Sequence, residues 1–355
     1  MKIRSVVASC EDLQLTRPYT IAYKTVTHVE NVVVKVELEN GIVGLGTANP
    51  SKYVVGSDTA ATLRALQLAD LDQLKGKDIR AFYSLLQYVH QLFSKEAGAR
   101  AALDIALHDA FTQWLGVPLA GFLGQVINKL PTSITIGIKP VAETLVEAKE
   151  YVERGFRILK VKLGQSPEED IERLVKLREV HGNNIIIRID ANQGYTAEEL
   201  ISFYERTVPL HLELIEQPLK ADAVNDMKQL PSYIKRLIAA DESLVNPADA
   251  FHLADYPGAC GIFNIKLMKC GGIQPALEIA TIAQNAGLEL MWGCNDESII
   301  SISAALHAAY ASAATRYLDL DGSFDLARDI VSGGFNVKDG YMSINGQPGL
   351  GVTPL

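Results

Sequence analysis

Three carboxylates have the type and spacing of metal ligands. Asp190, Glu216 and Asp241 each close a short apolar run, and they lie 26 and 25 residues apart. Apolar runs separated by stretches long enough for a helix are typical of a parallel β/α barrel. The C-terminal ends of barrel strands meet at one mouth, where barrel active sites lie. Three hard oxygen ligands at that mouth would bind a divalent cation of the Mg²⁺ type.

Lysines occupy the neighbouring runs on both sides. Lys160 and Lys162 are two residues apart in the run before the first carboxylate, so in a strand they share a face and point together towards the barrel interior or its mouth. Lys266 ends the run after the third carboxylate. An uncompensated inward charge among apolar residues is costly, so Lys162 and Lys266 are predicted to be functional. Lys269 is predicted to be a solvated strand tip.

Eight strands with intervening helices are expected to position these residues, in a barrel that covers residues 126–328. The expected strands are Thr132–Ile138, Ile158–Leu163, Ile185–Asp190, Leu212–Glu216, Leu237–Asp241, Ile262–Lys266, Leu288–Trp292 and Tyr317–Asp319. The expected helices include Glu168–His181, Ala197–Arg206, Asn246–Ala254, Pro275–Ala286 and Ser298–Ala313.

Residues 1–125 do not show this alternation of strands and helices, and they are predicted to form an α+β capping domain. Three antiparallel strands are expected first and three helical stretches after them: Ile3–Ser9, Asn31–Leu38 and Ile42–Ala48, then Thr59–Leu71, Ile79–Leu92 and Ala97–Leu115. The segment 329–355 is rich in Gly and strand-like, and we expect it to leave the barrel and return to the capping domain. The predicted fold class is therefore α/β, a modified TIM-type barrel with a capping domain that the C-terminal tail completes.

The composition excludes several classes of protein. With 355 residues, 48% apolar and 21% charged, the chain is expected to be a soluble globular protein of one barrel plus a smaller domain. The net charge of −9 and the lack of basic runs argue against nucleic-acid binding. No apolar run reaches transmembrane length, and the N-terminus starts with strand-like sequence rather than a signal peptide, so we predict a cytoplasmic protein. The four cysteines form no CxxC pair and are expected to be free thiols.

These motifs together resemble those of the enolase superfamily, in particular its muconate-lactonizing-enzyme-like subgroup. The resemblance covers essentially the whole chain and rests on Lys160-Val-Lys162, Asp190-Ala-Asn-Gln, Glu216-Gln-Pro, Asp241-Glu-Ser and Asn264-Ile-Lys266-Leu-Met-Lys-Cys-Gly-Gly272. It implies that Asp190, Glu216 and Asp241 bind Mg²⁺. It also implies that Lys162 and Lys266 are the two acid/base catalysts and that Lys160 contacts the substrate carboxylate.

One further motif resembles that of dipeptide epimerases, which carry an Asp-x-Asp after the eighth strand to bind the N-terminal ammonium of the substrate. Here it reads Asp319-Leu-Asp321, and the two carboxylates share a face if the segment stays extended. The expected substrate-binding residues are Lys160, Asp319, Asp321, Asp296, Thr135 and Lys24. A dipeptide is the expected partner, and the chain is expected to form a homo-oligomer.

The chemistry explains the residue types. The α-proton of the C-terminal residue of a peptide is a very weak acid, and its removal creates an enediolate whose second negative charge must be stabilised. A cation held by three carboxylates would supply that stabilisation. Burial and nearby cations are expected to lower the pKa of the lysines from ~10.4, so that one lysine removes the proton and the other returns it from the opposite face. The result is inversion of the α-carbon.

Substrate identity is less constrained, because two segments depart from the subgroup pattern. The seventh strand ends in Trp292-Gly-Cys-Asn-Asp-Glu-Ser298 rather than Gly-Ser-Met-x-Glu, and Lys24 takes the place of an Arg that pairs with glutamate in Ala-Glu epimerases. The segments Tyr19–Thr25 and Pro50–Gly56 are predicted to form an apolar and aromatic lid, through Tyr19, Ile21, Tyr23, Tyr53, Val54 and Val55. We therefore predict a preference for dipeptides with bulky apolar or aromatic side chains, with a basic N-terminal residue accepted next to Asp296.

Other functions remain open at this point. One is epimerisation of L-Ala-D/L-Glu, with Lys24 as the specificity residue. Others are an o-succinylbenzoate synthase, a muconate cycloisomerase or an N-acyl amino acid racemase on the same scaffold, which the Asp319/Asp321 pair disfavours because it suits an ammonium group. A purely binding or structural role would leave the metal carboxylates and inward lysines unexplained.

Overall fold

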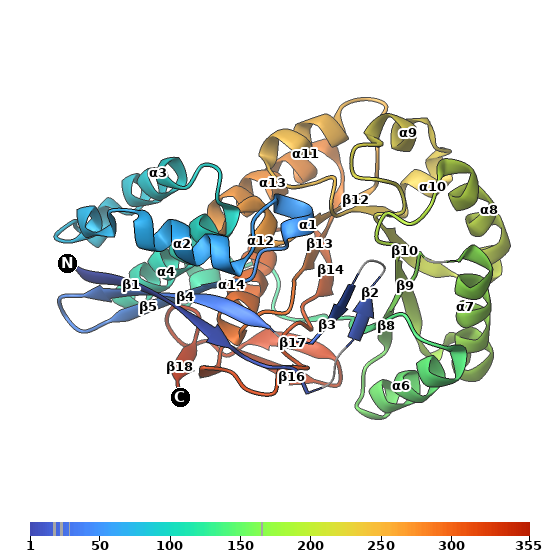
Figure 1. The fold of residues 1–355 in the computed structure, drawn as a ribbon, viewed down its shortest axis with the longest axis horizontal. Helices are drawn as coiled ribbons and strands as arrows, with labels where there is room; N and C mark the ends of the chain where they lie inside the picture. Colours follow the sequence, from blue (N-terminus) through green and yellow to red (C-terminus); the bar gives the residue numbers. More distant parts are fainter. Residues whose placement is uncertain (17–18, 22–23, 28, 165) are drawn as a thin grey trace.

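The computed structural model describes residues 1–16, 19–21, 24–27, 29–164 and 166–355, and for residues 19–21, 24 and 25 it describes the backbone alone. Within these ranges the chain forms an N-terminal α+β unit and a barrel, joined by a C-terminal tail (Figure 1). Residues 125 and 328, the predicted boundaries, both fall in connections between elements.

The N-terminal unit, called the cap below, is an antiparallel sheet in the order β1-β4-β5 covered by helices. Its elements are β1 (Ile3–Asp12), β2 (Tyr19–Ile21), β3 (Lys24–Val26), β4 (Glu30–Leu38), β5 (Val43–Ala48), α1 (Lys52–Val55), α2 (Thr59–Leu68), α3 (Phe82–Leu92), α4 (Ala97–Leu115) and α5 (Leu119–Leu123). Helix α4 approaches β5 closely because Gly44 and Gly46 lack side chains. A Cβ at these positions would lie 2.2 and 1.9 Å from the α4 backbone. The sheet and α4 therefore form the apolar centre of the cap.

Eight parallel strands form the barrel, in chain order around it. They are β7 (Ile134–Ile136), β8 (Ile158–Lys162), β9 (Ile186–Asp190), β10 (Leu212–Glu216), β11 (Ile238–Ala240), β12 (Ile262–Ile265), β13 (Glu289–Gly293) and β14 (Thr315–Asp319). The first and last strands meet only through an isolated bridge between Thr132 and Leu318, where the Ser133 N–H donates to the Leu318 carbonyl at 3.1 Å. This junction, called the seam below, closes the barrel.

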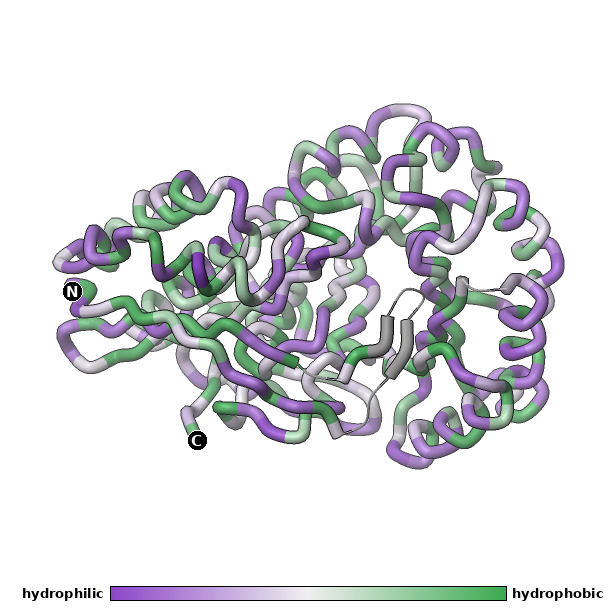
Figure 2. The backbone as a smooth tube through the Cα atoms, in the orientation of Figure 1, coloured by the Kyte–Doolittle hydropathy of each residue, from purple (hydrophilic) through white to green (hydrophobic). Residues whose placement is uncertain are grey.

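Helices surround the barrel and connect its strands. They are α6 (Val141–Glu153), α7 (Pro167–His181), α8 (Ala197–Thr207), α9 (Val224–Gln229), α10 (Ser232–Lys235), α11 (Pro247–Ala254), α12 (Leu267–Cys270), α13 (Ile273–Ala286) and α14 (Ile299–Tyr310). Along their turns hydrophilic and hydrophobic residues alternate, as expected for helices with one face on a core (Figure 2). No helix in the described ranges is long and apolar enough to span a membrane.

The tail continues from the last barrel strand without a further helix. Its strands are β15 (Val331–Gly333), β16 (Phe335–Lys338), β17 (Tyr341–Ile344) and β18 (Val352–Pro354). β17 pairs with β6 (Leu130–Pro131) at the start of the barrel. Further on, the Leu350 N–H donates to Asp109 of α4 at 2.9 Å. The tail therefore contacts both the barrel and the cap (red in Figure 1).

The predicted fold class is confirmed, whereas several element ends differ from the prediction. The eighth strand begins at Thr315, two residues before the predicted start. The predicted helix 59–71 ends at Leu68 and gives way to a 3₁₀ turn at Leu71–Leu74. The sixth strand ends at Ile265, because α12 begins directly after Lys266. All four cysteines are free thiols, as predicted.

A buried histidine links the cap to the barrel and makes the fold sensitive to acid. His307 of α14 is fully buried, and its Nδ1 accepts the Ala120 N–H of α5 at 2.9 Å. Burial lowers the pKa of His307 to about 4. In the unfolded chain its pKa is ~6.5. The unfolded state thus binds the proton first, and the stabilisation present above pH ~6.5 is lost as the pH falls towards 4.

We expect His307→Asn, which keeps an acceptor near the Nδ1 position, to reduce this acid sensitivity. The melting temperature of the wild type should fall more between pH 6.5 and pH 4.5 than that of the variant. Thermal denaturation followed by circular dichroism at both pH values measures the difference. Equal losses in both proteins would contradict a role for His307.

Candidate active site

The predicted metal carboxylates lie side by side at the C-terminal end of the barrel. Asp190 and Glu216 end β9 and β10, and the pairing register sets Lys162, Asp190 and Glu216 level across three neighbouring strands. Asp241 follows β11 directly. All three carboxylates are buried. The structure thus brings together the residues that the sequence placed in one mouth.

Each of these carboxylates lies next to at least one lysine. Lys162 Nζ lies 2.5 Å from Asp190 Oδ2, and Lys266 Nζ lies 2.8 Å from Asp241 Oδ2. Lys160 Nζ lies 2.7 Å from Glu216 Oε2. Lys162 and Lys266 stand on opposite sides of the carboxylate group, because β9, β10 and β11 separate their strands. This is the arrangement that the sequence predicted for two bases.

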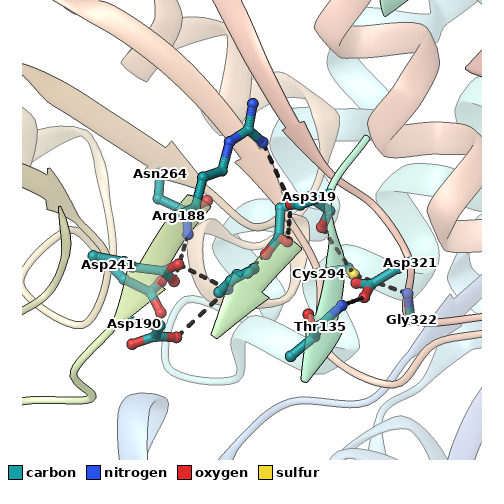
Figure 3. Close-up of polar contacts among 12 residues, drawn as sticks. Thr135, Arg188, Asp190, Asp241, Asn264, Cys294, Asp319, Asp321 and Gly322 are labelled. Carbon is teal, nitrogen blue, oxygen red and sulfur yellow. Dashed lines mark hydrogen bonds and ion pairs between the residues drawn. The ribbon is translucent and has the colours of Figure 1, made fainter. Parts of the chain in front are cut away.

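Lys160 also joins the carboxylate group to the last strand. Its Nζ lies 2.6 Å from Asp319 Oδ2 and 3.5 Å from Asp190 Oδ2. Figure 3 shows these two carboxylates. The other oxygen of Asp319 accepts the Ser133 hydroxyl at 2.6 Å. Both oxygens of Asp319 are therefore engaged inside the protein.

Asp321 has different partners from Asp319. Its Oδ2 accepts the backbone N–H of Thr135 at 2.7 Å, across the seam. The following glycine, Gly322, packs tightly on the loop after β13, since a Cβ there would lie 2.0 Å from the Asn295 carbonyl. Cys294 adds to this packing: its thiol donates to the Asp319 carbonyl at 3.2 Å and its sulfur accepts the Gly322 N–H at 3.3 Å. The turn that carries Asp321 is thus fixed from both sides.

Lys269 corrects one prediction. It is buried rather than a solvated tip, because the short helix α12 turns it back towards the barrel. Its ammonium group contacts Asp241 Oδ1 and donates to the carbonyls of Asp241 at 2.6 Å and Asn264 at 3.0 Å. Asn264, two residues before Lys266 on the same face, donates to Glu216 Oε1 at 2.9 Å. Because residues two apart in a strand share a face, the sequence could have indicated Asn264 as a residue of the site. No comparable spacing could have indicated Lys269.

The charges of the site raise the pKa values of Lys160 and Lys266. Burial alone would lower the pKa of Lys160, but Asp319, Glu216 and Asp190 hold it well above its usual value. Burial would also lower the pKa of Lys266, but Asp241 and Glu216 raise it. The predicted lowering of the lysine pKa counted burial and neighbouring cations, Mg²⁺ among them, and it stays a prediction.

Three carboxyl groups of the site have raised pKa values. Burial, with the neighbouring charge of Asp241, raises the pKa of Glu242 to about 7. Burial, with the neighbouring charge of Asp190, raises the pKa of Glu216 to about 8. Burial, with the charge of Asp319, raises the pKa of Asp321 to about 7. By contrast, Lys162 and Lys160 hold the pKa of Asp190 below its usual range despite burial. The site thus contains more carboxyl groups than its lysines can neutralise.

That imbalance is what a divalent cation would correct. Six carboxylates stand against four lysines: Asp190, Glu216, Asp241, Glu242, Asp319 and Asp321 against Lys160, Lys162, Lys266 and Lys269. Full ionisation would leave an excess of two negative charges in a buried region, which is costly unless it is compensated. In the described ranges no three His, Cys, Asp or Glu side chains form a group that could already hold a metal ion. Asp190, Glu216 and Asp241 instead each pair with a lysine. The donor set, three hard oxygen ligands on adjacent strands, nevertheless fits Mg²⁺.

A cavity of about 170 Å³ opens beside these residues, between the barrel mouth and the cap. A water needs roughly 10–15 Å³ of such space, so the cavity has room for a small ligand. The predicted substrate residues Lys160, Thr135, Asp296, Asp319 and Asp321 all line it. Acidic residues that the sequence did not single out line it as well: Glu147, Glu242 and Asp325. Glu147 lies on α6 and Asp325 in a loop. From the sequence alone, an acidic residue in either position is expected to be a solvated surface residue.

Of the two predicted lid segments, only Pro50–Gly56 has side chains within the described part of the chain, and Val54 of this segment lines the cavity as predicted. From the cap, Asn49, Pro50, Ser51 and Val54 line the cavity, whereas Tyr53 is 66% exposed and does not. The Asn49 amide donates to the Asp296 carbonyl at 2.6 Å and fixes this part of the cap on the loop after β13. The side chains of Tyr19, Ile21, Tyr23 and Lys24 lie outside the described part of the chain.

Comparison with known proteins gives the family. Residues 3–124 match the family described as the mandelate racemase / muconate lactonizing enzyme N-terminal domain, and residues 143–355 match the enolase C-terminal domain-like family. The chain therefore belongs to the enolase superfamily, in its mandelate racemase and muconate lactonizing enzyme branch. This confirms the resemblance found in the sequence.

Two similar relatives are named as epimerases. The chain is 56% identical to the L-Lys-D/L-Arg epimerase of Desulforapulum autotrophicum, with all of both chains covered. It is 35% identical to the L-Ala-D/L-Glu epimerase of Clostridium acetobutylicum, over 100% of this chain and 99% of the relative. Among solved structures, it is similar to the dipeptide epimerase of Methylococcus capsulatus in complex with Mg and L-Arg-D-Lys. That match has a TM-score of 0.98 and 50% identity, and it covers 99% of this chain and 100% of the other.

We expect Lys269→Met to destabilise the fold by about 3 kcal/mol, the lower end of the cost of breaking a buried ion pair. The change removes one counter-ion of Asp241 and the donor to two buried carbonyls. The midpoint of guanidinium unfolding measures it. Lys176→Met is the matched control, because Lys176 and Glu179 form an exposed pair at 2.7 Å. Equal shifts in the two variants would show that Lys269 contributes no more than a surface lysine.

Proposed function

We propose that the protein is a Mg²⁺-dependent dipeptide epimerase that inverts the α-carbon of the C-terminal residue, on dipeptides with basic side chains. The observation that carries the proposal is the placement of Lys162 and Lys266 on opposite sides of three buried carboxylates. Two bases facing one α-carbon from both sides support inversion by proton transfer. The names of the relatives agree with this reaction class.

Asp190, Glu216 and Asp241 would hold the Mg²⁺ ion, at the C-terminal ends of adjacent strands. When bound, the ion supplies the positive charge that stabilises the substrate carboxylate as negative charge builds on it. Lys160, already in contact with Glu216 and Asp319, adds a second fixed positive charge next to that carboxylate.

To remove a proton, a lysine must have an unprotonated amine. The neighbouring carboxylates determine whether the lysine is protonated. Lys266 is held protonated by Asp241 and Glu216. If these two carboxylates served as metal ligands rather than as ion-pair partners, the proton on Lys266 would be held less tightly. One lysine then takes the α-proton, and the other, still protonated, delivers its proton to the opposite face.

The acidic lining of the cavity selects the rest of the substrate. Asp319 and Asp321 are proposed to bind the N-terminal ammonium group, with Asp321 next to the Thr135 backbone. Asp296 and Asp325 line the same cavity and would attract cationic side chains, whereas Glu147 in the lining already pairs with Lys139. Among the described residues that line the cavity, few are apolar, which favours basic over bulky apolar dipeptides. A basic preference also agrees with the L-Lys-D/L-Arg relative.

The expectations of a homo-oligomer and of a cytoplasmic location remain predictions. Sedimentation of the purified protein and fractionation of the native cells test them.

We expect L-Arg-L-Lys to be epimerised with a kcat/KM at least tenfold above that of L-Ala-L-Glu. Incubation in D₂O, with the mass shift and the chirality of the product measured, gives both values. Activity should be lost in EDTA and restored by MgCl₂, and an N-acetylated Arg-Lys should be a much poorer substrate. If L-Ala-L-Glu is preferred instead, Lys24 becomes the specificity residue and the acidic lining does not select the substrate.

We expect Lys162→Ala and Lys266→Ala each to abolish epimerisation, because inversion needs a proton donor on the far face. Each variant should still exchange the α-proton of one diastereomer in D₂O, and the two variants should differ in which one. Circular dichroism provides the control for folding. Near-wild-type epimerisation in either variant rules out the two-base mechanism.

A further inference from the structure

A buried acid in the cap lies outside the carboxylate cluster and does not line the cavity. Asp104 of α4 is completely buried. Its Oδ1 accepts the backbone N–H of Ile273 at 2.6 Å. Its Oδ2 lies 2.9 Å from His90 Nε2, and His108 Nδ1 lies 3.2 Å from Oδ1. The two histidines thus orient a carboxylate whose other partner is the first residue of α13, a barrel helix.

Arg100, one turn earlier on α4, contacts the same part of the barrel. Its guanidinium donates to the Cys270 carbonyl at 2.9 Å. Between Cys270 and Ile273 lie Gly271 and Gly272, with φ of +90° and +120°. A Cβ on Gly271 would lie 2.0 Å from Arg100, and one on Gly272 would lie 2.5 Å from Asp104. The two glycines therefore leave the space that the two cap side chains fill.

This turn is joined directly to one of the two proposed bases. Helix α12 contains only Leu267–Cys270, and Lys266 stands immediately before it. The Lys266 carbonyl accepts the N–H groups of Lys269 at 3.0 Å and of Cys270 at 3.2 Å. A displacement of the Gly271-Gly272 turn would therefore move the backbone of Lys266 and of Lys269, which both contact Asp241.

Lys162 is held in another way. It ends β8, and its register partner in β9 is Asp190, while the Leu163 N–H donates to the Asp190 carbonyl at 2.8 Å. Its backbone is fixed by the barrel sheet itself. The two bases thus have unequal supports, one from the sheet and one from a turn on which the cap helix packs.

We propose that Arg100 and Asp104 are positioning residues for Lys266, by which the cap sets the geometry of proton transfer on one face of the substrate. This inference rests on the proposed function. A misplacement of about 1 Å can cost on the order of a hundredfold in rate. Loss of the contact should therefore slow the proton transfer of Lys266 and leave that of Lys162 nearly unchanged.

The test compares Asp104→Ala with Asp109→Ala. Asp109 is the matched control, because it lies on the same helix, is completely buried, and accepts the backbone N–H groups of Leu45 at 2.8 Å and Leu350 at 2.9 Å. The α-proton exchange of both diastereomers of Arg-Lys is measured in D₂O with MgCl₂. Lys162→Ala and Lys266→Ala first assign one diastereomer to each lysine.

Asp104→Ala should lose tenfold or more in the exchange that depends on Lys266 and less than twofold in the other. Asp109→Ala should change both exchanges by the same factor. Arg100→Met, which removes only the bond to Cys270, should give the same one-sided loss and carries the test if Asp104→Ala does not fold. Equal losses at both faces, or no difference from Asp109→Ala, would overturn the proposal.

Backbone hydrogen exchange separates this inference from the proposed function. Mass spectrometry of a peptide covering residues 266–273 should show faster amide exchange in Asp104→Ala than in Asp109→Ala. That result requires no turnover of a dipeptide. If the wild type exchanges no dipeptide α-proton, the proposed function is wrong. Unchanged amide exchange in Asp104→Ala would show instead that the cap does not hold the turn.

Discussion

Buried charge at the barrel mouth is the constraint on which the rest of the structure depends. Carboxylates and lysines from β8, β9, β10, β14 and the ends of β11 and β12 lie within ion-pair distance of one another with little access to water. Such groups tolerate burial only when each keeps a partner. The strand register must therefore be maintained. The apolar strands, the helices and the cap together maintain it.

Much of the site followed from the sequence because it depends on local geometry. The two-residue repeat of a strand places Lys160 and Lys162 on one face, and parallel strands end at a common mouth. These rules need no knowledge of distant contacts. The strands were found to within a few residues for the same reason, and most errors lay at element ends, as at Ile265, where a short helix follows at once.

What the sequence did not provide depends on residues far apart along the chain. Lys160 contacts Asp319, 159 positions away, and that contact reverses the direction of the lysine pKa expected from burial. Lys269 was misjudged because the turn of α12 cannot be inferred from a strand pattern. Glu147 and Asp325 reach the cavity from a helix and a loop, where neither periodicity nor strand position marks an acidic residue as functional.

Asp319 and Asp321, the proposed substrate-binding carboxylates, also have a structural role at the seam. Strands β7 and β14 share a single bridge, and Ser133 to Asp319 and Thr135 to Asp321 add polar links across it. A mutation that altered either carboxylate would loosen the barrel as well as change what it binds. Divergence towards new substrates is therefore easier at positions that do not join the seam, such as the cap and the loop after β13. In a lineage of such enzymes, Asp319 and Asp321, the proposed ammonium site, would be retained. The residues that contact the substrate side chains would change.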